Sequence, residues 1–357
     1  MSKESKTMEK EAKAKAAAKQ PWTAQRVLDL ILNNALIIIM VIAVIYIAIV
    51  NKNFLKAASI INILAQTCAY LPVALGVGGC IVLTGTDLSA GRIVGLTACI
   101  SASLLQAVDA ASKMWPNLTP PPVLLVLLLA MVIGGAIGAF NGFFVAKYKL
   151  HPFIVTLATQ LIIYTILLLY VKAGENNGMA ISGLDKSYSS FITGSLLKIG
   201  GTPIPNYVWI AVICTALMWF IWNKTTFGKN MFALGANEEA ARVSGVNVFA
   251  TNIMVFALAG AMYAVTGFIE GARVASNTAN TGLNYESDAI AACVIGGVSV
   301  VGGIGKIRGI VIGVLMLRLI FVGLNMIGIN QDLFYIIKGG IILFACALDM
   351  RKYLVKR

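Results

Sequence analysis

The sequence has little charge for its length. Only 12% of its 357 residues are charged and 59% are hydrophobic, whereas an average soluble domain has roughly 25% charged residues. This scarcity excludes an ordinary water-soluble globule. The composition instead predicts an all-α, polytopic membrane protein, in which the 34 glycines let neighbouring helices approach closely.

Motifs for chemistry are also missing. The lone histidine, His151, precedes Pro152 at the start of an apolar run, where a turn residue is ordinarily found. The six cysteines are scattered singly, with no CxxC pair and no histidine cluster. The stretch around Lys306 lacks the leading glycine and the Ser/Thr of a P-loop, and no GxSxG motif is present. We therefore expect no catalytic residue, no metal and no cofactor in this chain, so energy must come from a partner or an ion gradient.

The basic residues gather at the two ends. The net charge is +13, and seven Lys and Arg residues lie in the first 26 positions, with four more in the last seven. Because basic residues favour the cytosolic side of a membrane, we predict a cytosolic basic tail over 1–26 and a cytosolic C-terminal tail over 351–357. The pattern favours a lipid bilayer over nucleic acid as the partner.

About ten apolar runs are long enough to cross a bilayer, which takes about 20 residues. Together they predict a transmembrane permease domain over 27–350. The polar stretches 108–121, 173–205 and 271–285 then lie on the outer side of the membrane, opposite the cytosolic tails. The predicted spans are 27–50, 58–84, 90–107, 122–147, 152–172, 206–223, 248–270, 286–301, 307–327 and 331–350.

Two glycine-rich stretches interrupt the apolar pattern in a similar way. Leu75–Ile93 reads LGVGGCIVLTGTDLSAGRI, and Val294–Ile310 reads VIGGVSVVGGIGKIRGI. Irregular backbone at membrane depth must be buried in protein or line a wet cavity. Paired broken segments therefore suggest an internal repeat around a pathway. We expect Asp87 or Ser89 to cap the helix that follows, to line that pathway, or to do both.

Charges also occur inside other spans. Arg318 and Lys338 lie in the last two apolar runs with no obvious acid nearby in the sequence, and we interpret both as structural. We assign the pathway to six polar residues: Asp87, Ser89, Asn141, Thr156, Glu286 and Asp288.

A cytosolic loop over 224–247 carries its own helix signals. Asn237 suits an N-cap, Glu238 and Glu239 suit the first turn, and Gly245 suits the end. The small residues between them would let such a helix lie close against another surface. We therefore predict a short docking helix over 237–245.

This loop resembles the coupling segment of binding-protein-dependent ABC importer permeases, in the sugar-transporting branch. Further matches are GTDLSAG (85–91), FNGFFVAKYKLHPFIVTLAT (140–159), TTFGKNMFALGANEEAARVSGV (225–246) and YESDAIAACVIGGVSVVGGIG (285–305). Within the branch, TGTDLSAGR and DAIAACVIGGVS are most similar to galactose/methyl-galactoside permeases. Ser287 stands where those permeases usually carry leucine.

The resemblance implies a non-catalytic subunit of the bacterial inner membrane that translocates galactose, methyl-galactoside or glucose. It also implies a second copy of the permease, a cytosolic ABC ATPase that uses ATP and Mg, and a periplasmic galactose/glucose-binding protein that provides most of the selectivity. The ATPase-coupling residues it implies are Gly235, Asn237, Glu238, Glu239, Ala240, Ala241, Arg242 and Gly245.

Three alternatives remain at this stage. A ribose or xylose permease shares the scheme of motifs. An ion-coupled secondary transporter could use Asp87, Glu286 and Asp288 to carry ions, but the docking helix would then have no purpose. A membrane scaffold without transport would leave the paired glycine-broken segments unexplained.

Overall fold

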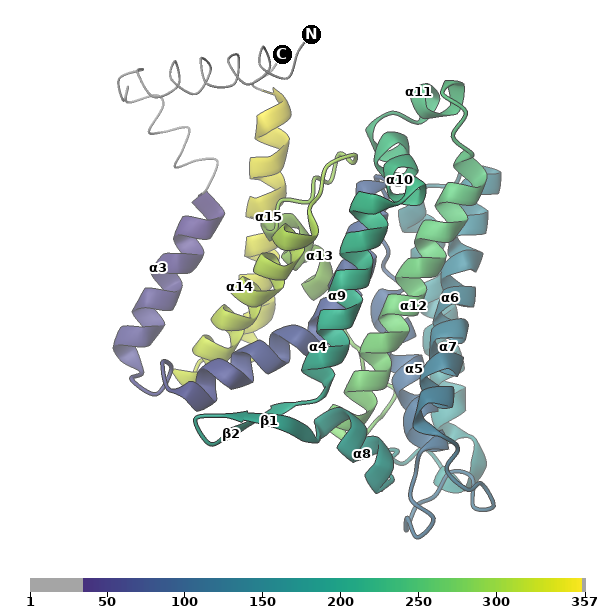
Figure 1. The fold of residues 1–357 in the computed structure, drawn as a ribbon, viewed down its shortest axis with the longest axis vertical. Coiled ribbons are helices and arrows are strands. Elements are labelled where there is room, and N and C mark those ends of the chain that lie inside the picture. The colour runs from purple at the N-terminus through teal and green to yellow at the C-terminus, as the bar shows by residue number, and fades with distance from the viewer. Residues whose placement is uncertain (1–34, 355–357) are drawn as a thin grey trace.

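The chain folds into a bundle of helices in a computed structural model that describes residues 35–354 (Figure 1). The predicted tail over 1–26, the beginning of the first span at 27–34 and the last three residues lie outside the described residues. Six helices are long and apolar enough to cross a membrane. They are α4 (Ala57–Val82), α6 (Val123–Tyr148), α7 (Pro152–Lys172), α9 (Tyr207–Lys224), α12 (Val248–Val274) and α14 (Ile307–Met326).

Shorter elements complete the bundle. The other helices of the bundle are α3 (Ala35–Val50), α5 (Ala90–Leu104), α13 (Tyr285–Ile295) and α15 (Leu333–Leu354), and the apolar stretches of α3, α5 and α15 are shorter than those of the six long helices. Outside the long helices lie η1 (Gly174–Asn176), α8 (Lys186–Thr193), β1 (Ser195–Ile199), β2 (Thr202–Pro205), α10 (Thr226–Ala236) and α11 (Glu238–Val243). The prediction of a mostly helical membrane protein is confirmed.

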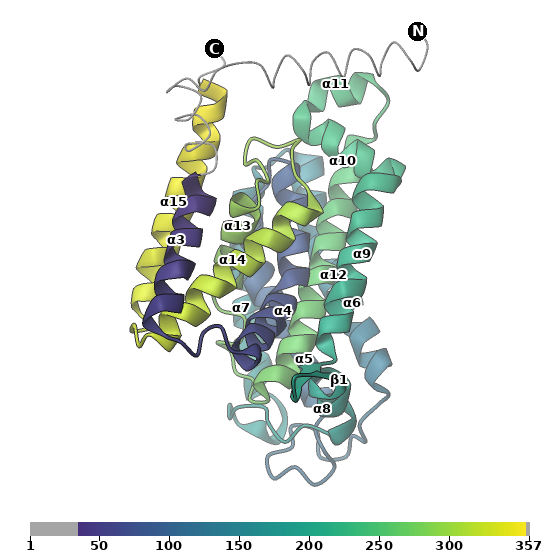
Figure 2. The same ribbon diagram turned by 60° about the vertical axis from the view of Figure 1, so that its left-hand side comes forward.

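The bundle has two distinct ends (Figures 1 and 2). We call one the α11 end, because α10 and α11 lie there, and the other the hairpin end, because it carries α8 and the β1–β2 hairpin. The helices α3, α14 and α15 stand together on one side of the bundle, and α5, α6, α7 and α12 form the other side (Figure 1). Helix α4 links the two sides, since it contacts α12, α13 and α14.

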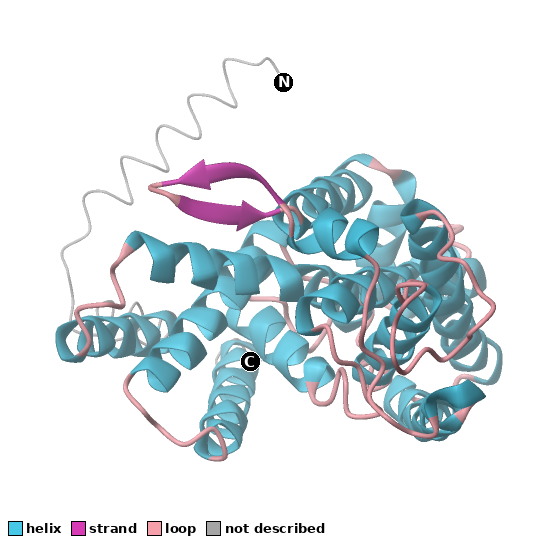
Figure 3. Cartoon of the chain, turned by 90° about the horizontal axis from the view of Figure 1, so that it is seen from below, coloured by secondary structure: helices cyan, strands magenta, loops and turns pink. Residues whose placement is uncertain are grey.

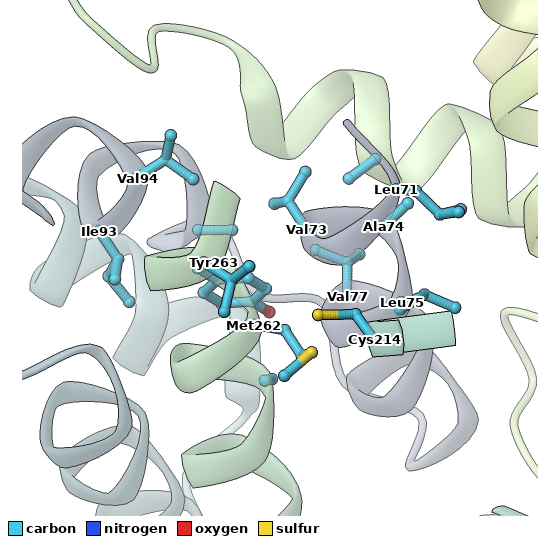
Figure 4. Packing of buried hydrophobic residues seen from close by; sticks show 14 of the residues in the cluster. Leu71, Val73, Ala74, Leu75, Val77, Ile93, Val94, Cys214, Met262 and Tyr263 are labelled. Carbon is cyan, nitrogen blue, oxygen red and sulfur yellow. The ribbon is translucent and has the colours of Figure 1, made fainter. Parts of the chain in front are cut away.

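Helix α12 is the centre of the packing and contacts α4, α5 and α6 along its length. Glycines allow this close approach: a Cβ added at Gly134 of α6 would lie 2.3 Å from the carbonyl oxygen of Gly260 of α12. Next to this contact, the buried side chains of α4, α5 and α12 form an apolar core that includes Val77, Ile93 and Met262 (Figure 4). Small residues therefore bring the backbones together, as expected for helices packed in lipid.

The predicted C-terminal boundary of the span 286–301 is wrong. Helix α13 stops at Ile295, because Gly297 takes a left-handed φ of +78° and residues 296–306 form an irregular loop. With 11 residues, α13 is about 16 Å long, roughly half of a hydrocarbon core of about 30 Å. The apolar composition of 294–301 suggested a helix, but the glycines decide the backbone.

The segment before α13 also differs from the prediction. The stretch 271–285 was predicted to be a polar connection on the outer side of the membrane, yet α12 continues to Val274 and residues 278–284 pack along α5 inside the bundle. The carbonyl oxygen of Thr281 would lie 2.2 Å from a Cβ at Gly95, and Arg92 donates a hydrogen bond to the carbonyl oxygen of Ala279 over 3.2 Å. The missing side chains at Gly91 and Gly95 make room for this irregular backbone inside the protein.

The hairpin end has more regular structure than a plain connecting loop. Asp185 caps α8 by accepting the N–H of Ser187 at 2.8 Å, and the antiparallel strands β1 and β2 follow. The hairpin projects from the side of the bundle when the molecule is seen from the hairpin end (Figure 3). Its Leu196 and Ile199 are exposed, so this end presents an exposed apolar ribbon.

Candidate functional site

Asp87 lies at the centre of a fully buried polar cluster between α4 and α5. Its Oδ1 atom accepts the backbone N–H of Ser89 at 2.9 Å and the Ser89 hydroxyl at 2.6 Å. Its Oδ2 atom accepts the hydroxyl of Tyr263, from α12, at 3.2 Å. Both carboxylate oxygens therefore have donors, which offsets the cost of placing an acid at membrane depth.

The cluster continues into α6 and α7. The Asn141 amide donates to the Ser89 hydroxyl at 3.0 Å and accepts the Thr159 hydroxyl at 2.6 Å. Thr156 donates to the carbonyl oxygen of Thr86 at 3.1 Å and accepts the N–H of Leu88 at 3.1 Å. The structure thus brings four predicted pathway residues, Asp87, Ser89, Asn141 and Thr156, into one network.

The structure does not show the expected side-chain cap on α5. The Ser89 side chain makes no capping hydrogen bond to α5, whereas Asp87 holds the N–H of Ser89 immediately before the helix begins. The four pathway residues of the network are all fully buried. The network ties the turn between α4 and α5 to three other helices, and its role in a pathway stays a prediction.

Replacing Asn141 with leucine is expected to destabilise the protein. The change removes the acceptor of Thr159 and a donor to Ser89, and a buried polar group left without its partner costs about 1–3 kcal/mol. A clear fall in the thermal unfolding midpoint of the purified protein would confirm it. Phe140→Leu, at a half-exposed neighbour, is the matched control, and an equal midpoint in both variants would contradict the proposed importance of the network.

The two other predicted pathway residues, Glu286 and Asp288, lie apart from this network, on the first turn of α13. They face different neighbours. The Glu286 carboxylate lies against α5, where a Cβ at Gly91 would be 2.0 Å from its Oε2 atom. Asp288 faces α14 and α15. The structure therefore divides the six predicted pathway residues between two sites.

Asp288 is the acidic partner of both bases inside the predicted spans. Arg318 of α14 donates to Asp288 Oδ2 at 2.6 Å, and Lys338 of α15 pairs with Asp288 Oδ1. The Arg318 guanidinium also lies 3.4 Å above the ring of Tyr70, which stacks on Tyr285 at 4.3 Å. One buried acid thus neutralises part of the charge of two bases and joins three helices.

The predicted docking helix is present at the α11 end. Asn237 caps α11 by accepting the N–H of Ala240 at 2.9 Å, and Arg242 pairs with Glu238 at 2.6 Å on the exposed face. Gly245 follows with a left-handed φ of +85°. Ala241 is buried against its own chain, whereas Ala240, Glu239 and Val243 are exposed. Of the alanine pair, only Ala240 therefore belongs to the accessible surface of α11.

Gly235 connects α10 to both glycine-broken stretches. A Cβ at Gly235 would lie 1.8 Å from the carbonyl oxygen of Val82 and 3.0 Å from the nitrogen of Gly303. The N–H of Gly303 itself donates to that Val82 carbonyl at 2.9 Å. The end of α4, the loop before α14 and α10 therefore meet at one point, so a movement of α10 would act on both stretches together.

Sequence reasoning missed several members of these sites. Thr159 is the last residue of the motif 140–159, although its role was not predicted. Tyr263 lies in an apolar run where no motif marks it as functional. Arg318 and Lys338 carried a usable signal, because a base inside a span needs an acidic partner, and Asp288 is the acid. His151 has the structural role expected for it, since its Nδ1 atom accepts the N–H of Phe153 at 3.3 Å at the start of α7.

Between residues 35 and 354, no three His, Cys, Asp or Glu side chains group together so that they could hold a metal ion. What the fold presents is a set of membrane-length helices, two buried polar clusters and an exposed helix pair at one end. These features are those of a polytopic helical membrane protein.

The sequence comparisons agree with this class. Residues 59–346 match the family described as "Branched-chain amino acid transport system / permease component", and the chain belongs to this family of transport permeases. The galactose/methyl galactoside import permease proteins of Salmonella typhimurium and Escherichia coli are each 46% identical over 86% of this chain and 90% of their own length.

A more distant relative completes the comparison. The ribose import permease protein of Haemophilus influenzae is 34% identical over 87% of this chain and 91% of its own length. No solved structure matches the chain. The resemblance to sugar importer permeases, and to the galactose type in particular, is thus confirmed.

Proposed function

We propose that the chain is the membrane-spanning permease of an ABC importer for galactose and methyl galactoside, with glucose as a related substrate. The observation that carries this proposal is the 46% identity to the galactose/methyl galactoside permeases over 86% of the chain, against 34% to a ribose permease over a similar length. Selectivity for the hexose rests mainly with a periplasmic galactose/glucose-binding protein, and the chain itself catalyses no reaction.

The arrangement at the α11 end supports a cytosolic ATPase as the source of energy. The helices α10 and α11 project from the bundle (Figure 2), and the exposed side chain of Val243 lies just beyond the Glu238–Arg242 pair. A partner docked on α11 would push α10, and Gly235 would pass the movement to the ends of α4 and α14. ATP and Mg bind to that partner and not to this chain.

The charge arrangement supports ATP over an ion gradient. A secondary transporter carries protons or ions on ionisable side chains that change state. Asp288 is held by two bases and Asp87 by three hydrogen bonds. Two of the three acids that the ion-coupled alternative would use are therefore not free to load and release an ion without breaking the contacts that stabilise their helices.

Ten crossings fit this function. The six long spans are joined by α3, α5 and α15, and by the segment 275–295, in which an irregular stretch followed by α13 makes one crossing. With the α11 end in the cytosol, both termini are cytosolic and the hairpin end faces the periplasm. Two copies of the chain in the bacterial inner membrane form the translocation unit.

The substrate assignment predicts a clear competition result. In vesicles that contain the chain, its ATPase and a galactose-binding protein, methyl galactoside in tenfold excess over labelled galactose should reduce uptake about tenfold when both bind alike. Ribose at the same excess should have little effect. Ribose competing as well as methyl galactoside, while the binding protein itself refuses ribose, would contradict the assignment of selectivity to that partner.

A further inference from the structure

A cavity of about 500 Å³ opens between α4, α14 and α15 at the hairpin end. Asn62 and Gln66 of α4, Asn325 of α14 and Gln331 before α15 line its outer part, and Asp288, Arg318 and Lys338 line its inner part. We call it the α14–α15 cavity. It is distinct from the Asp87 network, since no residue of that network lines it.

The inner part of the cavity lies well inside the bundle. Asn325 and Arg318 are separated by two turns of α14, or about 10 Å along the helix axis. Arg318 is 7% exposed and rests on the Tyr70 ring. Beyond Tyr70 the helices close tightly, because a Cβ at Gly313 of α14 would lie 1.9 Å from the carbonyl oxygen of Ala292 of α13. The cavity is thus open toward the hairpin end and closed toward the α11 end.

Hydrocarbon cannot fill a cavity with this lining. Amide, carboxylate and guanidinium groups at membrane depth need polar partners, because lipid tails offer none. The Nε atom of Arg318, buried at the inner end, has no hydrogen-bond partner among the described residues. The lining therefore requires either water or a polar ligand, and the cavity volume is within the range of about 300–1,000 Å³ that is usual for small-molecule sites.

The side chains match a neutral sugar better than a cation. Asn and Gln amides both donate and accept hydrogen bonds, as sugar hydroxyls do. Asp288 already contacts both bases, so the charged groups at the inner end are held by one another, and the one positive charge in excess is shared by Arg318 and Lys338. The stacked rings of Phe321 and Phe334, 5.5 Å apart, add an apolar wall, which suits the C–H face of a pyranose ring.

We propose that the α14–α15 cavity holds one hexose molecule after its release from the binding protein, as the first station within the permease. This inference rests on the proposed function, because it takes the hairpin end as periplasmic and the substrate as galactose. Binding is weak, since few polar groups of the cavity converge on one point and the sugar must leave again.

Thiol protection tests this station. In the full-length chain with its native cysteines replaced, Asn325→Cys and Gln331→Cys introduce thiols at two exposed lining positions with no side-chain hydrogen bond to lose. A small methanethiosulfonate reagent should label both. Galactose at about 100 mM should slow labelling about tenfold for a dissociation constant of about 10 mM, whereas sucrose at the same concentration should not. Leu196→Cys on the exposed hairpin is the control and should react at one rate throughout.

The outcomes separate the station from the proposed function. Galactose uptake is measured first, in the unmodified transporter and in the two variants before labelling. If the unmodified transporter imports no galactose, both the proposed function and the station are wrong. If uptake is normal but galactose protects neither thiol, or slows Leu196→Cys equally, the station is wrong while the function stands. Protection by inorganic phosphate instead of galactose would also overturn it. Loss of uptake after labelling of Asn325→Cys completes the expected result.

Discussion

Replacing Gly235 with alanine is expected to abolish most of the coupled uptake. The new Cβ would lie 1.8 Å from the Val82 carbonyl oxygen, which is backbone and cannot rotate away, and would disturb the hydrogen bond from Gly303 to that oxygen. Forcing an extra methyl into a packed contact costs about 1–3 kcal/mol. If this cost falls on the coupling between α10 and the two glycine-broken stretches, the equilibrium constant that links their movements changes about 5- to 150-fold.

Uptake per ATP hydrolysed, in vesicles with the ATPase present, measures this effect. Gly339→Ala is the control, because a Cβ there meets nothing within 4 Å and the backbone has no left-handed φ. Unchanged uptake per ATP in the Gly235 variant would show that the meeting of α4, α10 and the loop before α14 transmits nothing.

Replacing Asp288 with asparagine is expected to cause a large loss of stability. The change leaves Arg318 and Lys338 next to each other without the acid that both contact. Breaking a buried ion pair by removing one partner costs about 3–5 kcal/mol, because an uncompensated charge stays buried. A strong decrease in the yield of folded protein, together with a lower thermal midpoint, is the expected result.

Two further variants show whether the lost charge of Asp288 causes the loss of stability. Lys338→Met should cost less than Asp288→Asn, because Asp288 keeps its bond to Arg318. Glu239→Gln, whose carboxylate is exposed and lies 3.9 Å from Arg242, should leave the thermal midpoint unchanged, since exposed pairs contribute about 0–1 kcal/mol. If Asp288→Asn were as stable as Glu239→Gln, the cluster would not hold α13, α14 and α15 together.

The long helices could be predicted from the sequence because lipid imposes a simple rule on them. A run of about 20 apolar residues such as Val123–Tyr148 has few alternatives in a bilayer. Short elements obey no such rule. The end of α13 depends on the left-handed turn at Gly297, and the inward path of 278–284 depends on the absence of side chains at Gly91 and Gly95, which are contacts between distant parts of the chain.

The docking helix was predictable for a related reason. Its capping signals at Asn237 and Gly245 act within a few residues, so the local sequence determines the element. The partners of Asp288 could not be found this way, since Arg318 lies 30 positions away and on another helix. Only the rule that a base inside a membrane needs a partner pointed to such a pair, without saying which acid would supply it.

The most direct test of the account is the source of energy for uptake. Sealed vesicles containing this chain, its ABC ATPase and a galactose-binding protein should accumulate labelled galactose when the ATPase has ATP and Mg. Accumulation should stop with a non-hydrolysable ATP analogue and continue when an uncoupler removes the ion gradients. Galactose accumulation that needs no ATP and collapses with the uncoupler would contradict the assignment of this chain as an ABC importer permease.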